Sequence, residues 1–153
     1  MPDTESIVPI FQGEFRFGLD ESRRIMIPAK WRPKDQKMVF TAVLWPIEAP
    51  ECLLVLPPEG WQRILTLLKP QALSDKRVAV LERVIGGTST ALLLDKVGRF
   101  CLPDHLATSI GLEKEAMFVG RLEKFEIWNP NRYQAARPED KAVAAQLAVE
   151  LKI

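Results

Sequence analysis

The sequence predicts a single α+β domain in which two similar halves close one shared β-barrel around a pseudo-twofold axis. A motif of an Asp, an Arg four residues later, an apolar strand and a Pro occupies residues 20–28 and recurs, 75 positions later, at residues 95–103. Strand and helix patterns then follow both copies in the same order. Each half of the 153 residues is too short for a comfortable core of its own, so we expect one domain built from two repeats.

The composition is that of a globular chain, with 47% hydrophobic and 27% charged residues. A net charge of +1 excludes a broadly basic nucleic-acid coat but allows a local basic face. We expect no membrane partner, because no apolar run approaches the roughly 18 residues that a span needs. The N-terminus shows no pattern of a signal peptide, so the expected location is the cytoplasm.

The cysteines and the histidine point to no metal or cofactor. Cys52 and Cys101 both lie in apolar runs, so we expect two buried, reduced thiols. With no Cys-x-x-Cys pair and one histidine, His105, the sequence contains no recognisable zinc site.

The first half begins with an extended arm, residues 1–10, interrupted by prolines. Phe15, Phe17 and Leu19 alternate with small or polar residues, which is typical of a half-buried strand. Residues 20–23 form a turn, and the returning strand should place Ile25 and Ile27 on one face and Met26 on the other. A short helical turn follows at residues 28–32, because Pro28 suits a helix start.

Two strands and two helices complete the first half. Residues 38–45 and 52–56 are rich in β-branched, aromatic and aliphatic residues. Trp61, Ile64 and Leu68 form an amphipathic stripe on the next helix, which Pro70 ends. A second helix should start at Ser74 or Asp75 and stop at Gly86-Gly87.

The second half repeats this order. Residues 90–94 are nearly continuously apolar and are expected to be more buried than the first strand of the chain. Further elements are expected in this order: a turn at 96–98, a strand at 100–102, a short helix from 103 ended near Gly111, strands at 116–119 and 125–128, a helix start near Tyr133, and an Ala-rich helix at 138–152. Val143, Leu147 and Leu151 lie on one side of that last helix, and we interpret them as core or subunit packing.

These elements divide the chain into five segments. They are a flexible arm at 1–10, a first repeat at 11–70, a connecting helix at 71–87, a second repeat at 88–137 and a C-terminal helix at 138–153.

The repeated Asp and Arg carry the chemistry that the residues themselves suggest. Asp20 and Asp95 open tight turns, where a carboxylate accepts hydrogen bonds from backbone amides further on. Gly98 supplies a permissive backbone in the second turn. Arg24 and Arg99 either pair with the Asp of their own copy and only fix the turn, or project to an anion such as a phosphate or a guanine edge.

Basic residues gather around the motif in sequence. The first repeat has Arg16, Arg23, Arg24, Lys30 and Arg32, and the second has Lys96, Arg99 and His105. A basic face on a nearly neutral chain is typical of a nucleic-acid footprint, although charged turns are often merely solvated. An enzyme is not expected, because the chain has no Gly-rich phosphate loop and Asp104 beside His105 is no triad arrangement.

The duplicated motif, with Phe11-Gln12-Gly13-Glu14 ahead of it, resembles the MraZ family. The stretch 54–61 and Phe125-Glu126-Ile127-Trp128 strengthen the resemblance, which covers about residues 11–133. It implies two swapped-hairpin repeats of the AbrB/SpoVT kind in one chain and a ring-shaped homo-oligomer. It also implies a transcription regulator that binds short direct repeats in double-stranded DNA, upstream of its own division and cell-wall gene cluster, and is therefore associated with the nucleoid.

Within the resemblance, Arg24 and Arg99 match the DNA-contacting Arg, and Asp20 and Asp95 match the turn Asp. The usual family turn ends in Lys-Gly-Arg. The first copy here reads Ser22-Arg23-Arg24 and the second Val97-Gly98-Arg99. Without a Gly, the first turn must either differ in type or hold Arg23 in a costly left-handed conformation.

Two functions follow as hypotheses. The first is a DNA-binding regulator in which Arg24, Arg99, Arg23, Arg16, Lys96, Lys30 and Arg32 contact DNA, and in which the first copy contributes more of the DNA attraction. The second is an oligomeric adaptor that keeps the fold without DNA binding, motivated by the altered first motif. Neither hypothesis includes a cofactor, a metal or a small-molecule substrate.

Overall fold

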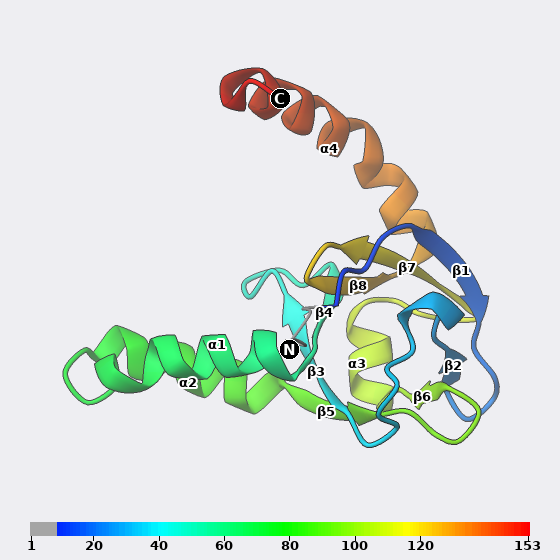
Figure 1. The fold of residues 1–153 in the computed structure, drawn as a ribbon, viewed down its shortest axis with the longest axis horizontal. Helices are drawn as coiled ribbons and strands as arrows, with labels where there is room; N and C mark the ends of the chain where they lie inside the picture. Colours follow the sequence, from blue (N-terminus) through cyan, green and yellow to red (C-terminus); the bar gives the residue numbers. More distant parts are fainter. Residues whose placement is uncertain (1–8) are drawn as a thin grey trace, which may run out of the picture.

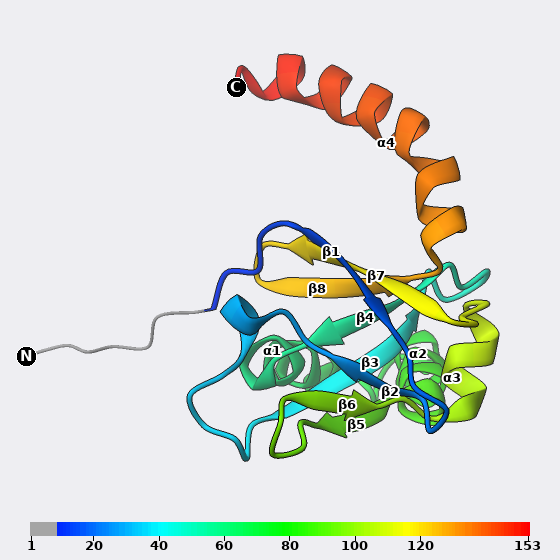
Figure 2. The ribbon, with the colours of Figure 1, turned by 90° about the vertical axis from the view of Figure 1, so that its right-hand side faces the viewer.

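A six-stranded antiparallel sheet and a separate two-stranded ribbon enclose the core of the protein (Figures 1 and 2). The computed structural model describes residues 9–153. The strand order in the large sheet is β1-β7-β8-β4-β3-β5, and β2 pairs with β6 in the ribbon. The α+β class is therefore confirmed, whereas the pairings among residues 9–153 form an open sheet and a ribbon, not one closed barrel.

Most predicted elements are present within a residue or two of their expected bounds. In chain order the elements are β1 (Glu14–Gly18), β2 (Arg24–Met26), η1 (Ala29–Trp31), β3 (Val39–Trp45), β4 (Cys52–Leu56), α1 (Pro58–Leu68), η2 (Lys69–Gln71), α2 (Lys76–Thr88), β5 (Thr90–Leu93), β6 (Arg99–Cys101), α3 (Asp104–Ser109), β7 (Glu115–Arg121), β8 (Lys124–Trp128) and α4 (Pro130–Leu151).

When each strand of the large sheet is exchanged for its counterpart in the other half, the same strand order results, read from the opposite edge of the sheet. The exchange replaces β1 by β5, β3 by β7 and β4 by β8. As a consequence, the first strand of each half pairs with the other half, β1 with β7 and β5 with β3.

The ribbon has the same internal symmetry. Ile25 pairs with Phe100, its own counterpart 75 positions later. The flanking backbone hydrogen bonds also correspond, because Ile27 donates to the Gly98 carbonyl at 3.1 Å and Leu102 donates to the Arg23 carbonyl at 2.9 Å. The two copies of the sequence motif thus make equivalent backbone hydrogen bonds.

One core draws its side chains from both halves. Ile25, Ile27, Phe100 and Phe125 are fully buried within it, and Trp31 packs against Phe125 with ring centroids 5.1 Å apart. Met26 is half-buried on the other face of β2, as the alternation predicts. The largest cluster of buried side chains thus combines residues of both halves.

The expectations about burial are met only in part. β5 contains one buried residue, Leu92, where β1 contains none, but Leu93 is 54% exposed. The reason is that β5 is an edge strand with one face on the core, so its apolar sequence does not reflect burial on both faces. Cys101 is exposed on the ribbon, while Cys52 is buried, and burial raises the pKa of the Cys52 thiol.

Two helix ends also differ from expectation. The helix α2 does not stop at Gly86-Gly87 but continues to Thr88, whose hydroxyl donates to the Val84 carbonyl at 2.7 Å. The helix predicted to begin at Pro138 is part of α4, which starts at Pro130 and passes through Pro138. Figure 2 shows that α4 bends along its length, as expected of a helix with an internal proline.

The helices cover the body of the protein unequally. On α1, Leu68 is buried, and Trp61 and Ile64 pack against the β3 and β4 side chains. By contrast, Val143, Leu147 and Leu151 of α4 are exposed, so core packing within one chain is wrong for them. Both the α1–α2 hairpin and the C-terminal part of α4 extend away from the sheet (Figure 1). None of the described helices is long and apolar enough to cross a membrane.

The N-terminal arm is described in part. Residues 1–8 lie outside the described residues, so the expectation of a flexible arm stays a prediction for them. Phe11 is buried, and its backbone N–H donates to the Leu122 carbonyl at 2.6 Å. The chain is therefore tied to the sheet from Phe11 onward.

Candidate nucleic-acid interface

The two Asp–Arg turns have the same hydrogen bonds. Asp20 Oδ1 accepts from the backbone N–H groups of Ser22 and Arg24, both at 2.9 Å, and its Oδ2 accepts from Arg24 Nε at 2.8 Å. Asp95 repeats this pattern with the backbone of Val97 and Arg99 and with Arg99 Nε, again at 2.8 Å. Each Asp is thus a clamp on its own turn.

This clamp accounts for the electrostatics of both carboxylates. The backbone N–H of Arg24 lowers the pKa of Asp20 most, with further lowering by the Arg24 guanidinium and the Ser22 N–H. The backbone and side chain of Arg99 and the N–H of Val97 lower the pKa of Asp95 in the same way. Both carboxylates therefore stay ionised, and hold their turns, to a lower pH than an ordinary Asp side chain would.

The clamp leaves much of each arginine accessible. The Arg24 side chain is 43% exposed and that of Arg99 is 32% exposed. Arg99 Nη1 also lies 4.0 Å from Asp20 Oδ2, so the second Arg is shared between the two turns. The pairing of each Arg with the Asp of its own copy is therefore present, and the rest of each side chain stays accessible to solvent, whereas contact with an anion remains a prediction.

The ribbon arranges both arginines on one surface. In the register of β2 and β6, Arg24 lies opposite Cys101, and Met26 lies opposite Arg99. Because alternate residues of a strand share a face, these four side chains form the outer face of the ribbon. Its inner face is the fully buried Ile25–Phe100 pair. The core thereby fixes the separation and orientation of the two arginines.

Arg23 has the left-handed conformation that its position requires. Its φ is 62°, and Gly98, the corresponding residue of the second turn, has a φ of 88°. Arg23 Nη1 donates to the Leu112 carbonyl at 3.2 Å, and Nε lies 3.4 Å from Asp104 Oδ1. The first turn therefore keeps its type, and the side chain ties it to α3.

The side chain of Arg32 packs against the second turn, as that of Arg23 packs beside the first. A Cβ atom on Gly98 would lie 2.6 Å from Arg32 Nε and Cζ, so the guanidinium covers this glycine. Arg32 also donates to Met26 Sδ at 3.0 Å. Lys96 is exposed in the same turn, and Lys30 is exposed on η1.

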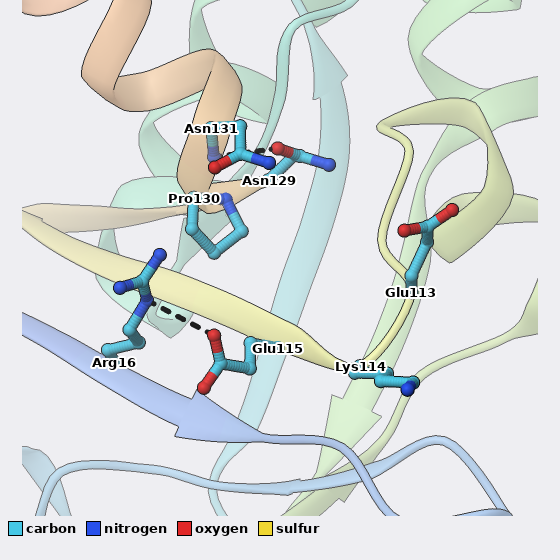
Figure 3. Close-up of a pocket in the computed structure, with 7 residues that line it drawn as sticks. All are labelled: Arg16, Glu113, Lys114, Glu115, Asn129, Pro130 and Asn131. Atoms are coloured by element: carbon cyan, nitrogen blue, oxygen red, sulfur yellow. Dashed lines mark hydrogen bonds and ion pairs between the residues drawn. The ribbon is translucent and has the colours of Figure 1, made fainter.

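Arg16 belongs to a different surface. It lies on β1, where its Nε is 3.3 Å from Glu115 Oε1 of β7, and it lines a cavity of about 300 Å³ beside the start of α4 (Figure 3). The structure thus brings together Arg23, Arg24, Arg32, Lys96 and Arg99 around the ribbon and leaves Arg16 on the large sheet.

Sequence reasoning missed the partners that hold the basic side chains. Asp104, Leu112 and Met26 contact Arg23 or Arg32 across distances of 6 to 89 positions in the chain. A local motif cannot reveal such contacts. The one available signal was the repeat offset, which aligns Arg23 with Gly98.

No cluster of potential metal ligands is found in the part of the chain that the structure describes. No group of three or more potential ligands occurs within residues 9–153. The Ser109 hydroxyl donates to the backbone carbonyl of His105, so this contact makes no nucleophile–imidazole pair.

The fold and this surface define an α+β protein of two motif repeats whose Asp–Arg turns meet at a two-stranded ribbon. A family model described as "MraZ protein, putative antitoxin-like" matches residues 85–149. The chain belongs to the MraZ family, as its resemblance implied, because relatives with this name are 31–33% identical over 82–90% of the chain.

Relatives match over most of the chain. A protein named "Transcriptional regulator MraZ" from Thioalkalivibrio sulfidiphilus is 31% identical over 130 residues, which are 85% of this chain and 87% of the relative. Proteins of the same name from Azotobacter vinelandii and Lachnoclostridium phytofermentans are 32% and 33% identical, over 90% and 82% of this chain and 91% and 86% of their own lengths.

Proposed function

We propose that this protein is a sequence-specific, DNA-binding transcriptional regulator of the MraZ type. Its operator would be a set of short direct repeats in the promoter of its own division and cell-wall gene cluster. The relatives named "Transcriptional regulator MraZ" support the regulatory role. The observation that carries DNA binding is the pair of exposed arginines, Arg24 and Arg99, fixed on one face of the ribbon.

A two-stranded ribbon is a suitable reader of DNA. The major groove admits such a ribbon, and an Arg fork can make two parallel bonds to the O6 and N7 of a guanine. The Nε of each arginine is held by its own Asp, so the side chain is oriented before DNA arrives. Arg24 and Arg99 would therefore read bases.

The surrounding cations would act on the phosphates. Lys96 and Lys30 are exposed, and Arg32 lies between the second turn and β2. Arg23 would contribute charge while bound to Asp104, and Arg16 would reach only DNA that extends to the large sheet. Contacts of this kind set register and make affinity fall with salt.

The architecture we propose is a pseudo-twofold pair of swapped hairpins, whose open sheet and ribbon together surround one core in a barrel-like arrangement. It is supported by the pairing of each first strand with the other half, β1 with β7 and β5 with β3. In this scheme residues 11–70 and 88–137 are the repeats, 71–87 connects them, and 138–153 is the C-terminal helix.

We also propose a ring-shaped homo-oligomer, located in the cytoplasm and associated with the nucleoid. The projecting α1–α2 hairpin and α4 support assembly, because they expose Leu67, Leu73, Val143 and Val149. Neighbouring subunits of a ring would each present a ribbon to successive DNA repeats. Linked sites raise the effective concentration, so weak single contacts suffice.

The test is binding of the full chain to the DNA upstream of its own gene, measured by fluorescence anisotropy at several salt concentrations. We expect specific binding that weakens steeply with salt and a loss of at least about tenfold per arginine in Arg24→Ala/Arg99→Ala. Arg77→Ala is the matched control, because Arg77 is an exposed, ion-paired arginine on α2. Wild-type affinity in the double variant would make the motif purely structural.

A second candidate is an oligomeric adaptor that does not bind DNA. The exposed apolar side chains of α4, including Val143 at 61% and Val149 at 77%, favour it. A pull-down that recovers a stoichiometric protein partner without enrichment of DNA would support this candidate over the regulator.

A further inference from the structure

We propose that a second site on this protein binds a small amphipathic anion, and that Arg32 couples this site to the second Asp–Arg turn. The site is a cavity of about 460 Å³ between the start of the described chain, η1 and the beginning of β3. A cavity of this volume is in the range of small-molecule sites. It is separate from the outer face of the ribbon.

The floor of the cavity is aromatic and rigid. Phe11, Trp31 and Phe40 line it, and all three are buried in the main core. Their rings hold one another edge to face, with centroids 5.5 Å apart for Phe11 and Trp31 and 6.5 Å apart for Phe11 and Phe40. Half-buried Met38 adds an adaptable apolar side chain. The floor is therefore preformed for an apolar group.

The rim of the cavity is basic. Lys30, Arg32 and Lys34 line it and are exposed, and no salt bridge involves any of them within residues 9–153. One carboxylate, Asp35, also lines it, but its Oδ1 accepts from the Lys37 backbone N–H at 2.9 Å. Three cations against one carboxylate leave a positive rim above an apolar floor.

This combination selects the chemistry of the occupant. An inorganic anion would leave the aromatic floor unused, and an uncharged apolar molecule would leave the cations unused. A carboxylate or phosphate carried on an apolar body matches both parts, because charged rim groups strengthen hydrogen bonds to an anion. The basic rim and apolar floor of this cavity thus favour a small molecule of that class.

Arg32 links the cavity to the turn. It lines the cavity, and its guanidinium covers Gly98 and donates to Met26 Sδ. A bound anion that draws this guanidinium to the rim takes it away from the second turn and from the outer face of the ribbon. The effect on DNA affinity rests on the proposed function, whereas the binding of the anion does not.

Octanoate is the probe for binding, with octan-1-ol as its uncharged counterpart. We expect octanoate to bind the full chain with one site per chain, to shift the amide signals of Trp31 and Phe40 in NMR spectra, and to bind at least about fivefold tighter than octan-1-ol. Lys30→Gln/Lys34→Gln should reduce octanoate affinity toward that of the alcohol, with Arg32 as the remaining rim cation. Lys141→Gln/Lys152→Gln, two exposed lysines on α4 and at its end, should leave it unchanged.

Several outcomes would overturn the site. They are equal binding of the acid and the alcohol, indifference to the Lys30→Gln/Lys34→Gln change, or signal shifts away from the cavity. Binding that occurs only after deletion of residues 1–8 would assign the cavity to the chain's own beginning. A change in oligomeric state that replaces the shifts at Trp31 and Phe40 would assign it to a second copy.

The coupling is tested by DNA affinity at saturating octanoate. We expect a loss of several-fold in the wild type and none in Arg32→Ala, whose octanoate binding is measured in parallel. Unchanged DNA affinity in the wild type would refute the coupling. If the chain binds octanoate as described but binds no DNA, the proposed function fails and the anion site stands.

Discussion

Arg23 and Gly98 occupy the same position in the two turns, and both have a positive φ, 62° and 88°. The first turn therefore holds a large side chain in the left-handed conformation that the second turn reaches with a glycine. The difference is compensated by different neighbours, because Arg23 reaches Leu112 and Asp104, while Gly98 lies under Arg32. This inequality between the repeats leads to the first two predictions.

Gly98→Ala should destabilise the protein by about 1–3 kcal/mol, because the left-handed backbone disfavours a Cβ atom. The added atom would also lie 2.6 Å from the Arg32 guanidinium. Urea denaturation measures the loss. The same substitution in an Arg32→Ala background separates the two causes, since only backbone strain remains there. Unchanged stability in both backgrounds would contradict the turn geometry.

Arg23→Gly should be more stable than Arg23→Ala by about 1 kcal/mol. Both variants lose the contacts to Asp104 and Leu112, but only glycine relieves the left-handed strain. Paired thermal or urea denaturation curves measure the difference. If Ala equals Gly, the residue at position 23 is not left-handed in solution.

Asp20 should titrate below the ordinary value of about 3.9 for an Asp side chain. A lowered pKa means that the clamp contributes stability above that ordinary value and loses it as the pH falls through the folded-state pKa. NMR titration of the carboxyl carbon measures it. Arg24→Ala should raise the pKa only in part, because the backbone N–H groups of residues 22 and 24 remain.

Arg24→Ala should weaken DNA binding more than Arg99→Ala, whereas Arg99→Ala should lower the urea midpoint more. Arg24 is the more exposed of the two, and Arg99 also approaches Asp20 of the other turn. Anisotropy titrations and denaturation curves of the two single variants provide the comparison. Equal losses of DNA affinity would remove the predicted asymmetry between the repeats.

Tyr133 should ionise above the usual tyrosine value of about 10. Burial and the hydrogen bond from its hydroxyl to Glu14 Oε2 both raise its pKa, and Arg137 pairs with the same Glu14 oxygen at 2.7 Å. It is the single tyrosine of the chain, so an ultraviolet pH titration reports on it alone. Glu14→Gln should bring the value closer to the usual one. A wild-type value near 10 would place α4 away from β1 in solution.

Local patterns predicted the elements well where one face is buried and the other is not. The alternation at β2 placed Ile25 and Ile27 inside and Met26 outside, and the structure agrees. The same reasoning was wrong for Cys101 and did not predict the exposure of Leu93 in β5, because an apolar residue at a sheet edge or on the outer face of a ribbon still meets solvent. It was also wrong for Pro138, which α4 accommodates by bending.

The sequence by itself determined the repeat, the clamp residues and the membership of the MraZ family. The hydrogen bond that the Arg24 backbone N–H donates to the Asp20 carboxylate spans four positions, so a short motif contains both partners. The tertiary structure decided which basic side chains share a surface. Arg24 and Arg99 meet because Ile25 and Phe100 are buried as a pair, and burial of apolar area between distant segments is a property of the whole core.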